Sequence, residues 1–308
     1  MDHSGESNNG IPKVSIGLPA YNSAKYLREA LDSLLAQTFT DFELIISDDA
    51  STDETSEICQ EYMTKDRRIR YIRQPQNTGM AANQNFVFQQ ARGEFFMWAG
   101  HDDKWDKEFI KTLLNALVSN ERYTSAFCPY VHIDEAGEII SDIKYLDFSS
   151  RSRIVRLLKL CLHYGDWSFY GLHKRKAIKN ARIPVWWWIN SAIPVNSIYP
   201  VVFYCLSVGE YVTVGKSPLL FYRVKKKPYP TSFRSAGFLG EYFAFVLRKV
   251  NLLYESALSV YQGTRSMLVV YVILPALIGR CVYDCLQKPI HYCYATLQSL
   301  LLAKNNQN

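Results

Sequence analysis

The stretch Val14–Thr55 decides the fold of this chain, and it reads VSIGLPAYNSAKYLREALDSLLAQTFTDFELIISDDASTDET. An apolar run, Lys13–Leu18, predicts a buried strand, and a second run, Phe42–Ile46, predicts another. Between them, apolar residues recur at helical spacing after Ser23, which is typical of a helix capped by a serine. A strand, a helix and a second strand in this order predict parallel pairing through a right-handed crossover.

The same alternation continues through the first third of the chain. A second helix is expected to begin at Ser51 or Thr52, followed by a strand at Ile69–Arg73, a helix at Met80–Ala91 and a strand at Glu94–Ala99. The predicted fold class is therefore α/β, with a Rossmann-like, mainly parallel sheet flanked by helices.

The second half of the chain is less regular. The predicted elements are a strand at Ser125–Ile133, a hairpin turn at Asp134–Gly137, a helix at Ser152–Cys161, strands at Tyr211–Val214 and Leu219–Val224, and helices from Gly237 onward. A soft boundary at Pro228–Ser235 separates a domain of residues 11–230 from a helical C-terminal region, residues 231–308. Residues 1–10 are predicted to be a disordered leader.

The composition argues against several classes of protein. The net charge of +6 over 308 residues is modest and is not gathered in one stripe, so we expect no nucleic-acid partner. The 7 cysteines form no CxxC pair, which argues against a disulfide framework and a zinc site. The first residues lack the apolar core of a signal peptide, so a cytoplasmic location is expected.

One apolar segment, Met267–Gly279, raises the question of a membrane. It is shorter than the roughly 20 residues of a spanning helix and contains Pro275. The segment therefore favours a buried or interfacial helix, and leaves open peripheral contact with the inner face of the cell membrane or with a partner protein.

Two pairs of carboxylates follow predicted strands of the same sheet. Asp48 and Asp49 come after the second strand, and Asp102 and Asp103 come after the fourth. Ligands of such sheets bind beyond the carboxyl ends of the strands, so these acids are candidate binding residues. Asp48 and Asp49 could accept hydrogen bonds from a uracil base or a ribose. The other interpretation is a turn with a helix cap, although it explains adjacent like charges less well.

The second pair predicts a metal site. A nucleoside diphosphate would be repelled by carboxylates unless a divalent cation lay between them, and Mn²⁺ or Mg²⁺ takes oxygen ligands of this kind. Asp102 is the candidate ligand, because the metal would stabilise the leaving diphosphate. His101 is either a second ligand or a polar loop residue. Asp103 would help to position the donor sugar.

Three further residues are candidates for donor binding. Gly79, two residues after Asn77, permits a tight turn and a close approach of the backbone. Asn85 either holds the loop that carries the acids or is a surface amide of the helix.

The segments Val14–Thr55 and Asn77–Asp103 together resemble family 2 glycosyltransferases, which have the GT-A fold. The similarity extends to about Phe109. It implies that the loop after the first strand lines the nucleotide and that an acid after the second strand contacts the base. The loop residues at the matching positions are Pro19, Ala20, Tyr21 and Asn22, and the acid is one of Asp48 and Asp49.

The chain departs from the family pattern at two places. The usual Asp-x-Asp-Asp begins here with Gly100, so its first acid is missing. In the closing strand, many members carry a histidine two residues after the position of Arg223, where this chain has Lys225. A protonated lysine does not bind a metal, but it could contact the diphosphate directly.

The family inverts the anomeric centre, which requires a general base on the acceptor hydroxyl. The family's base is usually an acid before the late strands, but Trp186–Tyr199 offers only Asn190 and Asn196. Asp166, beside Trp167, is the nearest candidate base, and an ordinary loop aspartate is the other interpretation.

The resemblance thus implies an inverting, metal-dependent transfer from a nucleotide-diphosphate sugar, with UDP-sugars favoured, to a carbohydrate or lipid-linked hydroxyl. Such an enzyme would act in polysaccharide or glycoconjugate biosynthesis. Residues 11–110 would form the donor half and residues 120–230 the acceptor half. The alternative is a non-catalytic sugar-nucleotide-binding or scaffolding subunit, because one acid and a clear base are missing.

Overall fold

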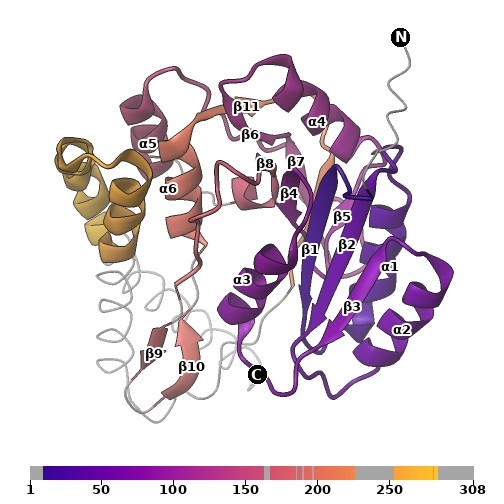
Figure 1. The fold of residues 1–308 in the computed structure, drawn as a ribbon. Coiled ribbons are helices and arrows are strands. Elements are labelled where there is room, and N and C mark those ends of the chain that lie inside the picture. Colours follow the sequence, from indigo (N-terminus) through magenta and orange to yellow (C-terminus); the bar gives the residue numbers. More distant parts are fainter. Residues whose placement is uncertain are drawn as a thin grey trace, which may run out of the picture.

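A computed structural model describes residues 10–162, 167–184, 186–188, 191–195, 198–225, 253–279 and 281–283. Its centre is a seven-stranded sheet with the order β11-β6-β8-β4-β1-β2-β3 (Figure 1). The strands are β1 (Val14–Ala20), β2 (Phe42–Asp48), β3 (Ile69–Arg73), β4 (Phe95–Trp98), β6 (Tyr123–Phe127), β8 (Leu172–Lys174) and β11 (Glu210–Thr213). All neighbours pair in parallel except β8, which runs antiparallel to β4 and β6. The prediction of a mainly parallel sheet flanked by helices is confirmed.

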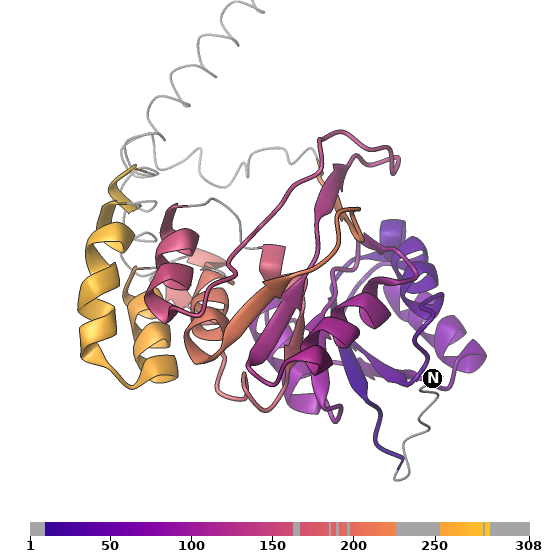
Figure 2. The same ribbon diagram turned by 90° about the horizontal axis from the view of Figure 1, so that it is seen from above.

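Helices cover both faces of this sheet. Along the chain they are α1 (Ala24–Leu35), α2 (Thr55–Lys65), α3 (Met80–Gln90), α4 (Phe109–Ser119), α5 (Arg153–Leu162), the 3₁₀ helix η1 (Trp167–Tyr170) and α6 (Tyr199–Val208). The chain steps outward from β1 to β3 through α1 and α2, and returns to β4 through α3. Because each crossover is right-handed, α3 lies on the face opposite α1 and α2 (Figures 1 and 2).

The core lies between these layers and explains why β1, β2 and β4 are almost continuously apolar. Ile16, Leu44 and Phe96, one from each strand, are fully buried. A strand buried on both faces needs apolar side chains on both, which is the pattern of a central parallel sheet.

A second sheet of three strands stands beside the carboxyl end of β4. It consists of β5 (Lys104–Trp105), β12 (Leu220–Arg223) and β7 (Tyr130–Ile133), in the order β5-β12-β7. The predicted single strand Ser125–Ile133 is therefore wrong, because it is β6 and β7 in two different sheets. Pro129 falls at the break and has no N–H to donate, although its carbonyl accepts a hydrogen bond from Leu219 N. A short hairpin is formed by β9 (Trp186–Trp188) and β10 (Ser191–Val195).

The second helix begins later than expected. It starts at Thr55 rather than at Ser51 or Thr52, because Asp53 Oδ1 accepts hydrogen bonds from Thr55 N at 3.0 Å and Thr55 Oγ1 at 2.5 Å. The residues before it form a turn in which Ala50 has a φ of 58°.

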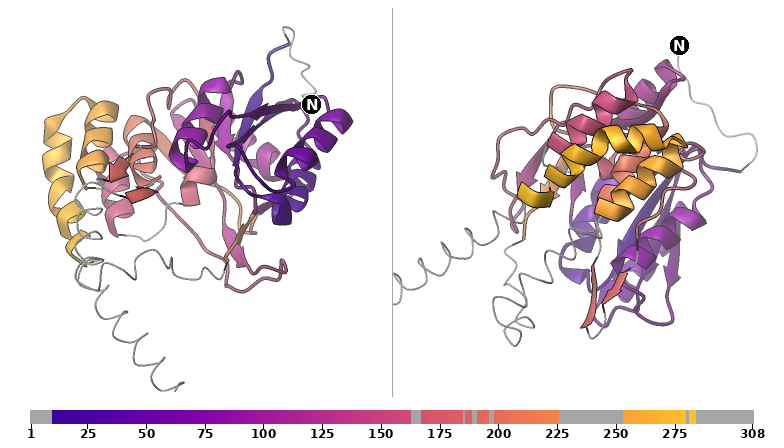
Figure 3. Two further views of the ribbon diagram at one scale, coloured as in Figure 1. Left: turned by 90° about the horizontal axis from the view of Figure 1, so that it is seen from below. Right: turned by 90° about the vertical axis from the view of Figure 1, so that its left-hand side faces the viewer.

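The C-terminal region is helical where it is described, as expected, over residues 253–264 and 267–279 (Figure 3). Within the described ranges, no helix is long and apolar enough to span a bilayer. Pro228–Ser235 and residues 1–9 lie outside the described residues, so the domain division and the disordered leader stay predictions.

Candidate active site

The loops after β1 and β2 are tied together at the carboxyl edge of the sheet. Asn22 N donates to Ser51 Oγ at 3.0 Å, and Thr52 N donates to Asn22 Oδ1 at 2.9 Å. Asn22 has a φ of 46°, in the left-handed region that asparagine tolerates better than most residues. Asn22 therefore joins the two loops, while its neighbour Tyr21 is 46% exposed at the surface.

Asp48 is fully buried and its carboxylate is engaged inside the protein. Its Oδ1 accepts a hydrogen bond from Ser51 N at 2.9 Å. Its Oδ2 accepts one from Tyr71 Oη at 2.9 Å and another from Arg73 Nη1 at 3.2 Å. The carboxylate therefore fixes the turn after β2, a role in which Tyr71 and Arg73 were not foreseen from the sequence.

Asp49 is also buried, with 2% of its surface exposed, and it holds the segment Asn77–Gly79. Its Oδ1 accepts hydrogen bonds from Thr78 N and Thr78 Oγ1, both at 2.8 Å, and its Oδ2 accepts one from Gly79 N at 2.8 Å. Gly79 has a φ of +89° at the start of α3, a conformation that favours glycine. The structure thus brings Asp49 together with Asn77 and Gly79; their contact with a base stays a prediction.

The loop-holding role that the sequence offered for Asn85 belongs to Asn83. Asn83 Nδ2 donates to Ser47 O at 2.9 Å, at the end of β2. Asn85 instead pairs with both backbone groups of Ile183, at 2.8 and 2.9 Å. The two residues lie two positions apart on α3 and point to different sides of it, and the sequence did not show which side faces the loop.

The carboxyl end of β1 separates the two acidic clusters. On one side, Asp49 N donates to Ala20 O at 2.9 Å. On the other side, Ala99 N, two residues before His101, donates to Gly17 O at 2.9 Å. Burial lowers the pKa of His101 against the opposing charge of Asp102, which favours the neutral imidazole, the form that binds metals. Both clusters therefore lie at one edge of the sheet.

Asp102 is the partly exposed carboxylate of the second cluster. Its Oδ2 pairs with Lys225 Nζ at 2.6 Å, and the two side chains are 20% and 31% exposed. Asp103 is buried, and its Oδ1 accepts a hydrogen bond from Arg223 N at 2.9 Å, which fastens β12 to this loop. Burial first, and the charge of Asp102 second, raise the pKa of Asp103 well above its ordinary value.

Arg223 is the functional residue that sequence reasoning passed over. Its buried guanidinium forms an ion pair with Glu29 and donates to Asp134 O at 2.8 Å. It also lies 4.5 Å from the centroid of the Tyr26 ring. Arg223 thereby connects β12 to α1 and to the turn after β7. Lys225, which pairs with Asp102, follows two residues later.

The space beside Gly100, at the position where the family pattern has its first acid, is filled. A Cβ at this position would overlap Asp103 Oδ2 and would lie 3.3 Å from Asp102 Oδ1. A side chain here would therefore displace the buried Asp103 carboxyl.

The remaining residues fit a divalent cation with substrate ligands. In the part of the chain that the structure describes, no three metal-binding side chains converge. Asp102 and the neutral His101 would supply two ligands, and diphosphate oxygens and waters the rest, which is how Mg²⁺ and related ions bind beside phosphates.

An aromatic cluster lies on the small sheet beside this edge. The ring of His132 is 5.7 Å from that of Trp167 and 5.9 Å from that of Tyr222, between centroids. Trp167 also stacks on Tyr130 at 5.2 Å. Among the described residues, His132 Nε2 is buried without a hydrogen-bond partner, and burial lowers the pKa of His132. Asp166, the candidate base, lies outside the described residues.

Comparison with known proteins shows which class of protein this chain resembles. Residues 15–182 match the model of glycosyl transferase family 2. Over 154 residues the chain is 31% identical to chondroitin synthase of Escherichia coli, an alignment that covers 50% of this chain and 22% of that protein. The chain spans 52% of another relative, the glycosyltransferase GlyG of Streptococcus pneumoniae serotype 4, at 29% identity over 156 residues, or 51% of this chain.

Solved structures share the fold. S. aureus TarS 1–349 in complex with UDP-GlcNAc superposes with a TM-score of 0.55 at 19% identity, over 89% of this chain and 81% of that one. The mannosyltransferase PcManGT from Pyrobaculum calidifontis, in complex with GDP-Man and Mn²⁺, superposes with a TM-score of 0.50 at 13% identity, over 96% and 81%.

The mainly parallel sheet flanked by helices matches the GT-A fold of these glycosyltransferases. This chain belongs to glycosyl transferase family 2.

Proposed function

We propose that this protein transfers a sugar, with inversion, from a UDP-sugar or a related nucleotide-diphosphate sugar to a glycan or lipid-linked hydroxyl in polysaccharide or glycoconjugate biosynthesis. The observation that carries the proposal is the position of Asp49 and Asp102, which follow the two strands that pair with β1 on either side. The nucleotide-sugar complexes of TarS and PcManGT and the similarity to chondroitin synthase support it.

The donor half would bind the nucleotide through the loop after β1. Tyr21 is exposed and can stack on the base, while Pro19 and Ala20 shape the backbone beneath it. Asp48 and Asp49 would shape the nucleoside site through the turns that they hold. Asn77 and Gly79 lie in the segment that Asp49 holds, whereas Asn85 contacts Ile183 instead.

The diphosphate would meet Lys225 and a Mn²⁺ or Mg²⁺ ion held by Asp102 and His101. A bound cation supplies positive charge to the departing diphosphate. Lys225 already lies 2.6 Å from Asp102, so its ammonium could turn to a phosphate oxygen when a metal takes the carboxylate. Asp103, buried behind them, would position the donor sugar by holding the loop and β12.

The acceptor hydroxyl would approach from residues 120–230. His132, Trp167 and Tyr222 present an aromatic surface of the kind on which sugar rings stack. Asp166 stays the proposed base, since it directly precedes Trp167.

Calorimetric titration with UDP and Mn²⁺ tests the donor site. The wild-type protein is expected to bind UDP more tightly with Mn²⁺ than without it, and Asp102→Ala is expected to lose that gain. Equal binding by wild type and variant would refute the metal site.

The second candidate function is a non-catalytic subunit that binds sugar nucleotides. The glycine at position 100 and the absence of a carboxylate in Trp186–Tyr199 favour it. Hydrolysis of a UDP-sugar, or transfer of its sugar to any member of an acceptor panel, would show that the protein is an enzyme. Tight donor binding with no turnover decides for the subunit.

We also propose a cytoplasmic protein in peripheral contact with the inner face of the cell membrane. The helix 267–279 has an apolar outer side, where Leu268 is 73% and Tyr271 is 64% exposed. Flotation of the full chain with vesicles of anionic lipid is expected, and recovery of all protein in the unbound fraction would refute the contact.

A further inference from the structure

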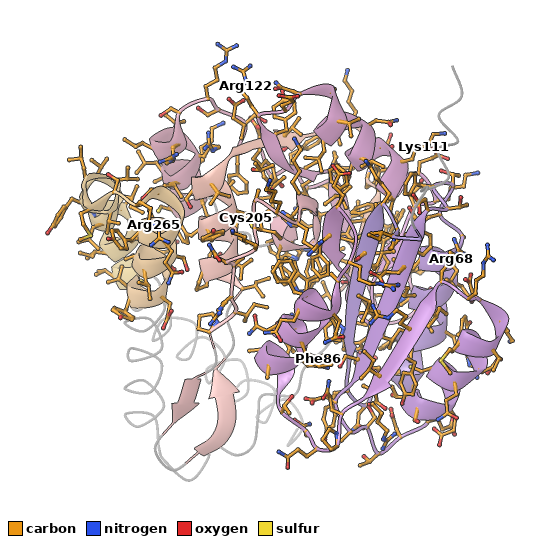
Figure 4. All side chains as sticks on the ribbon, viewed as in Figure 1. Arg68, Phe86, Lys111, Arg122, Cys205 and Arg265 are labelled. Atoms are coloured by element: carbon orange, nitrogen blue, oxygen red, sulfur yellow. The ribbon has the colours of Figure 1, made fainter. Side chains whose placement is uncertain are left out.

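A second charged hollow lies at the edge of the sheet opposite the candidate active site. Its volume is about 510 Å³, and it is lined by Glu121, Arg122, Thr124, Arg151, Arg153, Arg156, Val208, Gly209 and Glu210. The strands β6 and β11 run parallel to β1, and the hollow borders their amino-terminal ends. Arg122 marks this edge at the top of Figure 4. The hollow is thus separate from the donor loops, which follow the carboxyl ends of β1, β2 and β4.

Arg156 forms the floor of the hollow and is only 3% exposed. Its Nη1 donates to Ser150 O at 2.7 Å and to Arg151 O at 3.1 Å, and its Nε donates to Leu206 O at 3.0 Å. All three acceptors are neutral carbonyls, and burial lowers the pKa of Arg156. Over the described ranges, no carboxylate forms an ion pair with it. The charge of Glu210 opposes the effect of burial, but it acts without an ion pair. A buried cation that contacts no counter-ion is costly, and an anion in the hollow would relieve that cost.

The rim adds more positive than negative charge. Arg122 pairs with Glu210 at 3.5 Å. The side chains of Arg151 and Arg153 make no ion pair or hydrogen bond with any described residue. Four guanidinium groups therefore share the hollow with two carboxylates. Guanidinium groups bind phosphate through paired N–H donors, which makes a phosphate the matching ligand.

Exposed apolar side chains adjoin this hollow. Gly263, at the end of the helix 253–264, packs so closely on α6 that a Cβ there would overlap Ser207 and lie 3.2 Å from Val208 Cγ1. Val208 itself lines the hollow. The turn continues through the exposed Arg265 to Met267 and Leu268, which are 50% and 73% exposed. Figure 4 shows Arg265 on the C-terminal helices beside α6, which is marked by Cys205, with Arg122 above them.

We propose that this hollow binds the phosphate headgroup of an anionic phospholipid while Met267 and Leu268 enter the membrane interface. Arginines beside exposed apolar residues are the combination that holds a protein on an anionic membrane surface, since charge attraction and apolar burial add. The inference deepens the membrane contact proposed above and gives it a headgroup site. It does not depend on sugar transfer.

Vesicle binding by the full chain tests the proposal. Sedimentation with vesicles of phosphatidylglycerol and phosphatidylcholine in equal parts would compare the wild type with the double variant Arg151→Gln/Arg153→Gln. The matched control is Arg67→Gln/Lys107→Gln, which removes two exposed charges from distant loops. We expect the first double variant to bind roughly thirtyfold more weakly, and the control to bind within about threefold of wild type. Leu268→Ser should also bind more weakly, through loss of apolar contact.

Several outcomes would overturn the headgroup site. One is unchanged binding by Arg151→Gln/Arg153→Gln, and another is an equal loss in the control. Loss in Leu268→Ser alone would leave the membrane contact standing without this site. Equal binding of wild type to pure phosphatidylcholine would remove the role of charge. If titration with inorganic phosphate shows arginine-dependent binding while vesicles do not bind, the ligand is a soluble anion and the lipid assignment is wrong. Unchanged UDP binding in every variant shows that the donor site is intact.

Discussion

The central sheet carries carboxylates at both edges, and the closed cluster around Glu43 is built differently from the open cluster around Asp102. Glu43, near the amino-terminal edge, has only 4% of its side chain exposed. It accepts hydrogen bonds from Ser15 Oγ at 2.7 Å, from Arg70 Nη1 at 2.8 Å and from both the backbone and the guanidinium of Arg92. Asp102, at the carboxyl edge, has 20% of its side chain exposed and a single lysine partner.

The comparison shows that the number of acids at an edge does not identify a site, but their partners do. Glu43 already accepts hydrogen bonds from two arginines and a serine and has no free oxygen for a ligand. It therefore holds β1, β2 and β3 together. Asp102 retains a free oxygen and a partner on a long, flexible side chain, so it can exchange that partner for a ligand. Asp48 and Asp49 resemble Glu43 in this respect, because each buried carboxylate already accepts three hydrogen bonds from the residues around it.

The largest expected effect is on activity at the open cluster. Asp102→Asn should lower turnover by about a thousandfold, since metal binding contributes several kcal/mol to the departing charge. The free energy of unfolding should stay within about 1 kcal/mol of wild type, because a partly exposed ion pair contributes little. Initial rates with a UDP-sugar and a urea titration measure the two quantities. The control is Asp142→Asn, which changes an exposed aspartate elsewhere in the chain. An Asp102→Asn protein with normal activity would contradict the role of Asp102 as the residue that binds the metal.

The closed cluster should show the opposite pattern. Glu43→Gln leaves Arg70 and Arg92 without their counter-charge and should cost about 2 kcal/mol of stability with little change in donor affinity. Urea unfolding and UDP titration measure the two. Lost UDP binding in a folded Glu43→Gln protein would show that the two edges are coupled.

The pH dependence sharpens this second prediction. Burial alone would raise the pKa of Glu43, but hydrogen bonds from Ser15, Arg70 and Arg92 outweigh it, and the pKa is lowered from its ordinary value of 4.5. A lowered folded-state pKa gives stability that is present above about 4.5 and is lost as the pH falls through the folded-state value. The stability difference between wild type and Glu43→Gln should therefore shrink in acid; a constant difference would contradict this account.

A smaller effect is expected from filling the space at Gly100. Gly100→Ala would force its Cβ against Asp103 and should cost about 1–3 kcal/mol, with weaker UDP binding in the presence of Mn²⁺. The control is Gly279→Ala, at the end of the helix 267–279, where a Cβ meets no atom within 4 Å. Thermal unfolding compares the two, and equal behaviour would show that the space at Gly100 is not required.

The smallest expected effect concerns Lys225. Lys225→Met frees Asp102 and should tighten Mn²⁺ binding to the donor-free protein about fivefold, the value of a partly exposed ion pair. Donor affinity should fall, because an ammonium facing the diphosphate is lost. Electron paramagnetic resonance of free Mn²⁺ measures the first effect, with Lys216→Met as the control. Weaker Mn²⁺ binding in Lys225→Met would contradict the pairing.

The acceptor half shows where sequence patterns were insufficient. The run Ser125–Ile133 has the alternation of one strand, yet Pro129 divides it between two sheets. The prediction of Tyr211–Val214 and Leu219–Val224 as strands located both segments, but β11 joins the large sheet and β12 the small one. Strand pairing depends on distant partners, which local periodicity does not contain.

By itself, the sequence determined the βαβ order of residues 14–103, the mainly parallel sheet and the placement of Asp49 and Asp102 after strands that meet at one edge. These features follow from apolar periodicity and the handedness of crossovers, which are local properties of the chain. Only the tertiary structure decided that Asp48 and Asp49 are saturated, that Asn83 rather than Asn85 holds the loop, and that Arg223 sets Lys225 against Asp102. The physical reason is that hydrogen-bond partners and burial come from residues far apart in the chain, as the 121-residue separation of Arg223 from Asp102 shows.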